Sequence, residues 1–425
     1  MRASLHKGVS CHRGVLAAHM LELFRAAARL CFRVPGSLAF MIIALVGAGI
    51  VPGGAQESGT TDTAIFFGQS APSSGKSAEL GKDLRLGIEA AFNEVNLNGG
   101  VGGKNLYLRY LDDNYAPNQT VVNVRKLLGD RRGVFGLIGL VGAPSTKAII
   151  PIVEQEGIPL VAPMTGLEEL RDPSLHQNVI NLRPTHQQEA DKIVRHLNDD
   201  LGISKVSFLY QDDSFGRAGL EAITGAAEEF GIEIVGRAAF PRNTTAVKTA
   251  VFDLASIDAE AVVVAGAYES VAVALQWARK LDYKPVFITF SQVGGDALAN
   301  ALDGTDVTLF MTQILPDFEE DENGNLSAAY KAAIDAVWPG TKYGYVSYEG
   351  YLAGRLVAAG LERCADDLSR DCFINVFLQP ETIVIEDVSL TYSETDSQGT
   401  DAVYLTGYDP NAGFLPIRSL DDVIR

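Results

Sequence analysis

Short apolar segments alternate along this chain with longer amphipathic segments. Thr63–Gly68 and Leu106–Leu111 are typical of buried strands, and residues 78–96 between them show the spacing of a helix. The apolar stripe of that helix consists of Leu80, Leu84, Ile88, Ala91 and Val95. Strands that alternate with helices favour a parallel sheet covered by helices on both faces.

The alternation is interrupted at Arg183-Pro184 and then resumes. Each strand–helix unit in the second series takes about 30 residues, as expected for a βαβ unit. Two series of this kind predict two α/β lobes. The strands predicted in the second series are Val206–Tyr210, Ile232–Val235, Ala261–Ala265, Val286–Thr289 and Val307–Ile314.

The last third of the chain has a different pattern. Two long helices are predicted at Leu326–Val337 and Val346–Leu361, and the second has a face of small residues. Because it comes late in the chain, this helix could pack back on the lobe formed by the first series. Beyond Cys372 the pattern is strand-like at Ile383–Glu386, Ser389–Tyr392, Ala402–Leu405 and Phe414–Ile417.

Two neighbouring strands of the first series end in loops of small residues. Val134–Val141 leads into 142–146 (GAPST), and Ile158–Val161 leads into 162–166 (APMTG). Ligands of open parallel sheets bind at the carboxyl ends of strands, and free N–H groups at a helix start attract anions. The two loops therefore predict a carboxylate site. The alternative is that they are two ordinary strand–helix turns, which would show the same sequence pattern.

The N-terminal region has the order of a secretory signal. Six basic residues and one acid precede an apolar run at Leu38–Val51, and small residues follow up to Ala55. A membrane span needs roughly 20 apolar residues, so we favour cleavage near Ala55 over an uncleaved anchor. Met20 could be the true start. Cleavage would change the formal net charge from −18 to −23. A net charge this negative argues against a surface that binds nucleic acid.

Two of the four cysteines lie beyond that signal, in the segment CADDLSRDC. An isolated pair in an exported protein predicts a local disulfide between Cys364 and Cys372, with two reduced thiols as the alternative. The six histidines are scattered, so the sequence predicts no metal site.

Motifs for catalysis or cofactor binding are incomplete. Gly75-Lys76-Ser77 looks like the end of a phosphate loop, but position 70 is serine where the motif needs glycine. The acid pairs Asp112-Asp113 and Asp212-Asp213 could act as general acids or bases, but helix caps and solvated turns account for such pairs more often. Binding without chemistry and without a cofactor is therefore the leading class, with an exported hydrolase as an alternative.

Four segments together resemble the type 1 periplasmic binding proteins, in the leucine/isoleucine/valine-binding-protein-like branch of ABC-transporter receptors. They are Phe66–Asp113, Gly139–Arg171, Val206–Ile223 and Ala261–Lys280. The resemblance implies two Rossmann-like lobes with parallel-type sheets, joined by three crossovers, with a ligand in the cleft. We assign residues 62–184 and 314–372 to lobe I and residues 185–313 and 373–425 to lobe II.

The resemblance also implies a function and partners. The protein would be a periplasmic receptor for a small carboxylate-bearing ligand, an amino acid or related organic acid, working with ABC permease subunits at the inner membrane. A ligand sensor that signals to a membrane partner is the alternative. The ligand-contacting positions carried over from the family are Leu80, Ala143, Pro144, Ser145, Thr146, Met164, Thr165, Gly166, Phe215, Tyr268 and Ser291.

Two of these positions depart from the family pattern. The acid that pairs with a ligand ammonium aligns near Ser291, and the first serine of the carboxylate loop aligns with Ala143. A serine cannot neutralise an ammonium, and a buried charge without a partner is costly. Either Asp213 or Glu269 replaces the missing acid, or the ligand lacks an α-amino group.

Overall fold

The computed structural model describes residues 57–318 and 325–422. The predicted signal peptide, residues 1–55, lies outside this range, and its cleavage stays a prediction. No helix within the described residues has the length and apolar character needed to span a membrane.

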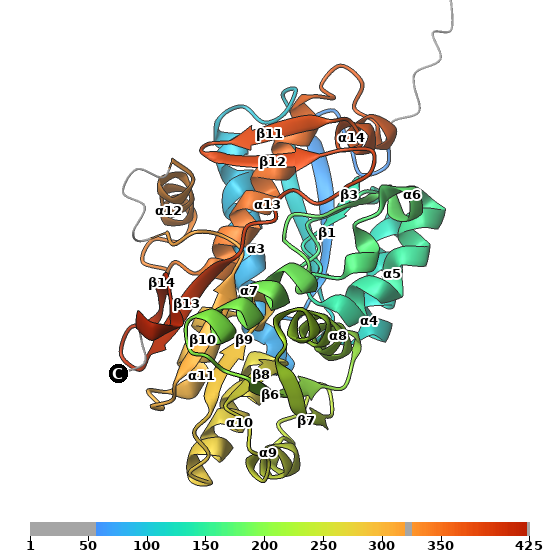
Figure 1. The fold of residues 1–425 in the computed structure, drawn as a ribbon. Helices are drawn as coiled ribbons and strands as arrows, with labels where there is room; N and C mark the ends of the chain where they lie inside the picture. The colour runs from blue at the N-terminus through green and yellow to red at the C-terminus, as the bar shows by residue number, and fades with distance from the viewer. Residues whose placement is uncertain (1–56, 319–324, 423–425) are drawn as a thin grey trace, which may run out of the picture. The chain divides into compact units, whose positions relative to one another are not determined.

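The first series forms a five-stranded, fully parallel sheet in the order β2-β1-β3-β4-β5. Helices follow its strands as the alternating pattern predicts (Figure 1). The strands are β1 (Ala64–Ala71), β2 (Asn105–Asp112), β3 (Gly136–Ile138), β4 (Leu160–Val161) and β5 (Val179–Ile180). The helices are α3 (Ala78–Leu97), α4 (Pro117–Gly129), α5 (Ala143–Glu156) and α6 (Pro173–His176), with the short turn η2 (Gly75–Ser77) before α3.

The second series forms a seven-stranded sheet in the order β14-β13-β10-β9-β8-β6-β7. Its pairs are parallel from β7 through β10, whereas β13 and β14 add antiparallel strands at one edge. The strands are β6 (Lys205–Gln211), β7 (Glu233–Phe240), β8 (Ala261–Ala265), β9 (Val286–Thr289), β10 (Leu309–Gln313), β13 (Tyr404–Asp409) and β14 (Gly413–Ile417). The helices are α7 (His186–Asp199), α8 (Ser214–Phe230), α9 (Lys248–Ala255), α10 (Tyr268–Lys280) and α11 (Gly295–Leu302), and the turn η4 (Ser291–Val293) precedes α11.

The long helix α13 (Tyr345–Glu362) packs against α3, a helix of the first series, as the sequence predicts. A Cβ added at Gly87 would lie 1.9 Å from the carbonyl oxygen of Ser347, and one at Gly350 would lie 2.2 Å from that of Leu84. The two helix backbones therefore touch, which only glycine allows at these positions. Helix α12 (Asn325–Val337) also contacts α3.

The C-terminal tail is divided between the two sheets, which corrects our assignment of all of 373–425 to lobe II. Phe373, on α14 (Arg370–Val376), packs against Phe67 and Phe135 beside the first sheet. The hairpin of β11 (Glu381–Ile385) and β12 (Val388–Tyr392) contacts α13. Only β13 and β14 join the second sheet, because the chain crosses over after Gln398, which pairs with Asn181.

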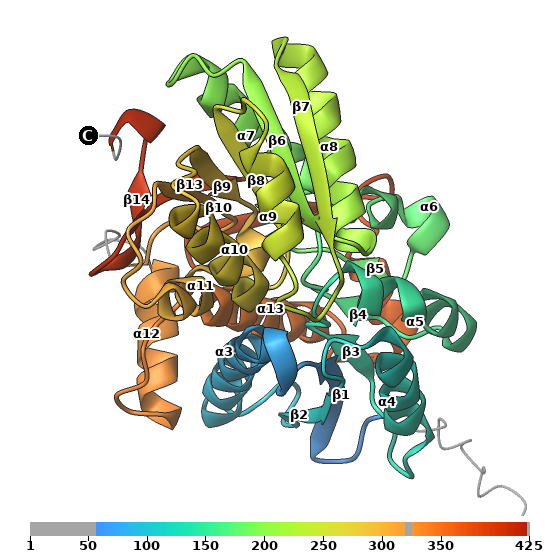
Figure 2. The ribbon, with the colours of Figure 1, turned by 90° about the horizontal axis from the view of Figure 1, so that it is seen from below.

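Within residues 57–318 and 325–422 the chain therefore passes between the sheets three times, near Arg183, near Ile314 and after Gln398. We call the first sheet with α3–α6, α12–α14 and β11–β12 the first lobe, and the second sheet with α7–α11 the second lobe. Figure 2 shows the two sets of elements from below. Cys364 and Cys372 form a disulfide in the first lobe, with their Cα atoms 6.0 Å apart, as the sequence predicts.

Candidate functional site

The two small-residue loops of the first lobe lie side by side. Gly142 donates its N–H to the carbonyl of Met164 (3.1 Å), and Met164 donates to the carbonyl of Leu140 (2.7 Å). Val141 and Met164 pair as an isolated parallel bridge beyond the ends of β3 and β4. The predicted convergence of the two strand ends is thus present, and all residues from 162 to 166 are buried.

Residues 143–146 form the first turn of α5. The N-cap is Gly142, with φ at 90°, and no side chain caps this helix. A Cβ at Gly142 would lie 2.4 Å from the ring of Tyr115, so the position accepts only glycine. The N–H groups of Ala143 and Ser145 have no intrahelical acceptor, and Pro144 has no N–H at all. Two backbone donors therefore remain at this helix start.

The three hydroxyls near these donors differ in their hydrogen bonding. Ser145 Oγ lies 3.0 Å from Thr120 Oγ1, which donates to Asp113, and Thr146 donates to the carbonyl of Gly142. Thr165 is fully buried, yet its hydroxyl has no partner among the described residues. Thr165 thus offers a free hydroxyl, whereas Ser145 and Thr146 already have contacts within the first lobe.

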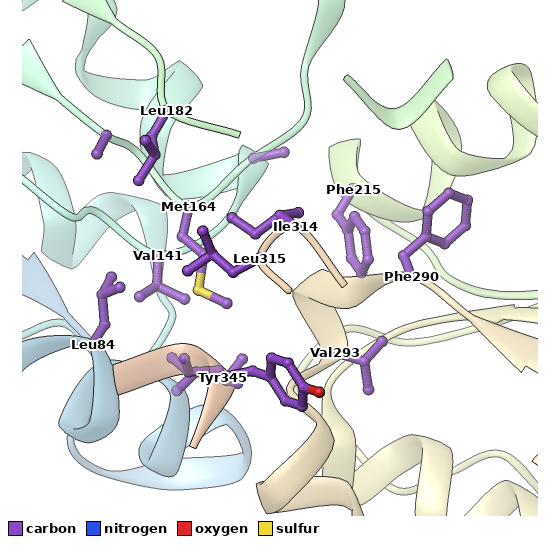
Figure 3. Close-up of a cluster of buried hydrophobic side chains, with 14 of the residues drawn as sticks. Leu84, Val141, Met164, Leu182, Phe215, Phe290, Val293, Ile314, Leu315 and Tyr345 are labelled. Atoms are coloured by element: carbon purple, nitrogen blue, oxygen red, sulfur yellow. The ribbon is translucent and has the colours of Figure 1, made fainter. Parts of the chain in front are cut away.

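Aromatic side chains form the opposite wall, in the second lobe. The rings of Phe215 and Phe290 lie 6.3 Å apart, and each packs against His186, at 5.5 and 6.0 Å. Figure 3 shows Val141 and Met164 facing this wall, with Ile314 and Leu315 between them and the phenylalanines. The facing surfaces of the two lobes are therefore largely apolar around a few polar groups, a composition that is typical of small-molecule sites.

His186 bridges the lobes at the first crossover. Its Nε2 lies 3.3 Å from the N–H of Gly166 and 3.1 Å from Oε1 of Gln292, while Nδ1 has no partner among the described residues. Burial lowers the pKa of His186 to about 3, helped by the nearby charges of Arg171 and Arg183. The ring is therefore neutral at physiological pH.

Ser291 lies in η4, at the end of β9. Its backbone N–H approaches Glu189 Oε2 and Thr312 Oγ1, both at 2.9 Å, and its hydroxyl has no partner among the described residues. Ser291 and Arg183 line a small cavity together with Glu349 and Tyr345. The cavity offers about 10 Å³, enough for about one water molecule. Around this cavity residues of the two lobes are in direct contact, and we call this the closed arrangement.

A buried ion pair forms the base of the site. Arg183 Nε and Nη2 donate to the two carboxylate oxygens of Glu349, at 3.0 and 2.8 Å, and the two side chains are 1% and 3% exposed. Arg183 Nη1 has no partner among the described residues. The nearby guanidinium of Arg171 donates to the carbonyls of Thr165, Arg183 and Pro184 and to Gln398, so it ties two crossovers together.

Contacts along the rim join the lobes directly. Leu80 reaches across to the second lobe, where a Cβ at Gly294 would lie 2.3 Å from it. Lys76 Nζ lies 2.6 Å from Glu269 Oε2. On the other side, Arg242 and Asn243 donate to the carbonyl of Tyr115. The predicted contact Leu80 is therefore at the interface, and Tyr268 is buried at the start of α10, where it interacts with the backbone of Glu79.

The two acids that we considered as ammonium partners both have other contacts. Glu269 is in the ion pair with Lys76. Asp213 caps α8 by accepting the N–H groups of Phe215 and Gly216, and burial raises the pKa of its carboxyl. Neither carboxylate is left free in the closed arrangement.

The sequence analysis missed His186, Glu189, Arg171 and the Arg183–Glu349 pair. One signal was present for Glu189, because it precedes Ile193 and Leu197 at intervals of four and so puts a carboxylate on the apolar stripe of a helix. Arg183 precedes a proline in the break between the two series. At such a position the sequence pattern does not distinguish a buried arginine from a solvent-exposed one.

Comparisons with known proteins agree on the family. A family model described as periplasmic binding protein matches residues 64–412. Leu/Ile/Val-binding protein homolog 7 of Brucella suis is 29% identical over 301 residues, which cover 66% of this chain and 73% of that protein.

Solved structures share the fold. A possible leucine/isoleucine/valine-binding protein from Rhodopirellula baltica has a TM-score of 0.78 and 28% identity, covering 85% of this chain and 98% of that one. A fatty acid ABC transporter substrate-binding protein from Thermomonospora curvata has a TM-score of 0.75 and 20% identity, and the match covers 87% of this chain and 96% of that one. The chain belongs to the periplasmic binding protein family, in the type 1 class that resembles the leucine/isoleucine/valine-binding proteins.

Proposed function

We propose that this protein is a periplasmic receptor that closes around a small carboxylate-bearing ligand, an amino acid or related organic acid, and delivers it to the permease of an ABC importer at the inner membrane. The observation that carries the proposal is the buried hydroxyl of Thr165 beside the uncapped start of α5, a hydroxyl that has no partner in the described part of the chain. Leaving a buried polar group without a partner costs about 1–3 kcal/mol. A ligand oxygen at this place would remove that cost.

The donors at this place suit an anion. The Thr165 hydroxyl and the N–H groups of Ala143 and Ser145 come from two neighbouring strand ends, and the start of α5 carries partial positive charge. The net charge of the chain is −18, which opposes long-range attraction of an anion. Binding would therefore depend on short-range hydrogen bonds rather than on electrostatic steering.

The apolar wall suits the remainder of such a ligand. Ile314 and Leu315 lie between Met164 of the first lobe and Phe215 of the second, with Phe290 beyond Phe215 (Figure 3), and these side chains would cover a hydrocarbon or aromatic group. The names of two related proteins refer to leucine, isoleucine and valine and to a fatty acid. Such ligands share a carboxylate and an apolar body, and the fold alone does not choose between them.

Closure would be part of the binding step. The ion pair of Lys76 with Glu269 and the bonds of Arg242 and Asn243 to Tyr115 join opposite lobes, so these contacts form only when the lobes approach. Closing would remove water from the ligand and bring polar groups of both lobes to it.

Titration calorimetry with a panel of apolar, aromatic and acidic amino acids and their deaminated analogues tests the proposal. We expect saturable binding of at least one carboxylate, and a loss of about tenfold or more in the Thr165→Ala variant. The corresponding amide or alcohol should bind more weakly than the acid. Absence of binding by every carboxylate in the panel would contradict the proposed function.

A further inference from the structure

The turn that follows β2 has an unfavourable backbone conformation. Asn114 and Tyr115 have positive φ angles, 50° and 55°, although neither residue is glycine. Asparagine tolerates this left-handed region, but a bulky side chain such as tyrosine rarely adopts it, and such a conformation persists only where the surroundings hold it in place. The contacts that hold Tyr115 are therefore a guide to the role of the turn.

Side chains of the second lobe hold the turn from one side. Arg242 Nη1 and Asn243 Nδ2 both donate to the carbonyl of Tyr115. Asn243 also donates to the carbonyl of Asn114, at 3.2 Å, and has itself a positive φ of 58°. The Tyr115 hydroxyl interacts with the side chain of Gln211, at the end of β6. Separation of the lobes would break these contacts.

The same turn touches the start of α5 from the other side. The Tyr115 ring lies so close to Gly142 that a Cβ there would be 2.4 Å from a ring carbon and 2.7 Å from the hydroxyl oxygen. The buried carboxylate of Asp113 accepts the N–H of Tyr115 and the hydroxyl of Thr120, both at 2.9 Å. Thr120 Oγ1 also lies 3.0 Å from Ser145 Oγ. Tyr115 therefore reaches the first turn of α5 by two routes, through its ring and through Asp113.

We propose that Tyr115 is a positioning residue: the second lobe fixes it on closure, and it then fixes the start of α5 in the geometry that binds the ligand carboxylate. This inference rests on the proposed function and adds a link between closure and the carboxylate site. When the lobes separate, the carbonyl of Tyr115 loses both donors from the second lobe, and the strained turn can relax. The carboxylate site is then complete only in the closed state, so a ligand that binds it shifts the protein toward closure.

The donors of the second lobe can be removed while Tyr115 stays in place. In the double variant Arg242→Met/Asn243→Gly, methionine keeps an apolar chain beside the Tyr115 ring, where the Arg242 guanidinium lies 5.9 Å from the ring centroid. Glycine accepts the positive φ at position 243. Both residues are half-buried in the loop between β7 and α9, so the variant should fold, which urea unfolding verifies.

Lys76→Met is the matched control. It removes another ion pair between the lobes, with 2.6 Å between Lys76 Nζ and Glu269 Oε2 and side chains 42% and 33% exposed. This pair joins η2 to α10 rather than the turn after β2 to the start of α5. Both variants therefore weaken closure, but the proposal predicts that only the double variant disturbs the carboxylate site.

The experiment combines calorimetry with hydrogen exchange of the N–H groups of residues 142–146, read by mass spectrometry. The ligand is the carboxylate that binds the unmodified protein most tightly, from a panel that begins with L-leucine, L-phenylalanine, 4-methylpentanoate and 3-phenylpropanoate. We expect the double variant to bind about tenfold more weakly or worse, mainly through faster dissociation. With saturating ligand, its residues 142–146 should exchange at least about threefold faster than in the unmodified protein. Lys76→Met should weaken binding about fivefold at most and leave this exchange unchanged.

Three results would overturn the positioning role while leaving the proposed function in place. They are an unchanged affinity of the double variant, an unchanged exchange of residues 142–146 at saturating ligand, and an equal acceleration of that exchange in Lys76→Met. The last result would mean that any weakening of closure loosens the start of α5. Absence of binding by every carboxylate in the panel would instead contradict the proposed function, and this inference with it.

Discussion

Arg183 and Glu349 form a buried, bidentate ion pair that joins the first crossover to helix α13, with 2.8 Å between Nη2 and Oε2. Removing one member of such a pair leaves an uncompensated charge and costs about 3–5 kcal/mol. We therefore expect Glu349→Gln or Arg183→Met to lower the free energy of unfolding by an amount of this order in urea titrations. The double replacement by apolar residues should recover much of the loss.

The exposed pair Arg217–Asp212 is the control, with side chains 60% and 56% exposed. Such pairs contribute about 0–1 kcal/mol, so Arg217→Ala should barely move the urea midpoint. Equal effects of Arg217→Ala and Glu349→Gln would show that the buried pair has no special role.

Replacement of Thr165 by alanine should weaken ligand binding about tenfold or more without lowering stability, because the hydroxyl has no partner to lose among the residues that the structure describes. Thr165→Ser keeps the hydroxyl and should retain most of the affinity. Calorimetry with the tightest carboxylate and a thermal melt check both parts. A large fall in melting temperature with unchanged affinity would show that Thr165 is structural.

The sequence predicted the fold well because its signals are local. Strands β8 (Ala261–Ala265) and β9 (Val286–Thr289) were predicted with their observed bounds. The predicted apolar stripe of α3 is buried at four of its five residues, and the fifth, Val95, is half-buried. Strand β3 was predicted as Val134–Val141 but covers only Gly136–Ile138. The prediction was too long because the residues on both sides of the hydrogen-bonded strand are also buried and apolar. Helix α14 was missed because its place is set by packing of Phe373 on distant residues of the first sheet.

The site was only partly predictable. The small-residue loops revealed the strand ends at Val141 and Met164, which a parallel sheet must bring together. The contact of Glu189 with Ser291 joins positions 102 residues apart and depends on how α7 lies against β10. No local pattern could pair these residues, and none could show that Asp213 is occupied as a helix cap.

The raised pKa of Asp83 predicts that the free energy of unfolding falls as the pH rises. Burial, Asp296 and Glu79 raise its pKa to about 7 from 3.8. A raised carboxyl pKa means that the folded state holds the proton more tightly than the unfolded state. The resulting stabilisation is complete below about pH 4 and is lost as the pH rises through about 7.

Asp83→Asn mimics the protonated form and should remove this part of the pH dependence. In thermal melts between pH 4 and pH 8, the melting temperature of Asp83→Asn should increase relative to that of the unmodified protein as the pH rises. Parallel curves for the two proteins would contradict the raised pKa.

The disulfide between Cys364 and Cys372 should be formed in the exported protein. It closes a short loop, so it is expected to stabilise the fold by about 2–3 kcal/mol on loop-entropy reasoning. Thiol titration of the denatured, unreduced protein lacking residues 1–55 should find no free thiol. Replacing both cysteines by serine should lower the urea midpoint, and two titratable thiols in the unmodified protein would refute the prediction.

Small-angle X-ray scattering with and without ligand tests the central claim most directly. In the closed arrangement Thr165 Oγ1, His186 Nδ1, Glu189 Oε1 and Ser291 Oγ have no partners among the described residues, and each such buried group costs about 1–3 kcal/mol. The empty protein should therefore be more open in solution than the closed structure. We predict that its radius of gyration falls on addition of a bound carboxylate, toward the value calculated from the closed structure. An identical radius with and without a saturating ligand would contradict closure around a ligand.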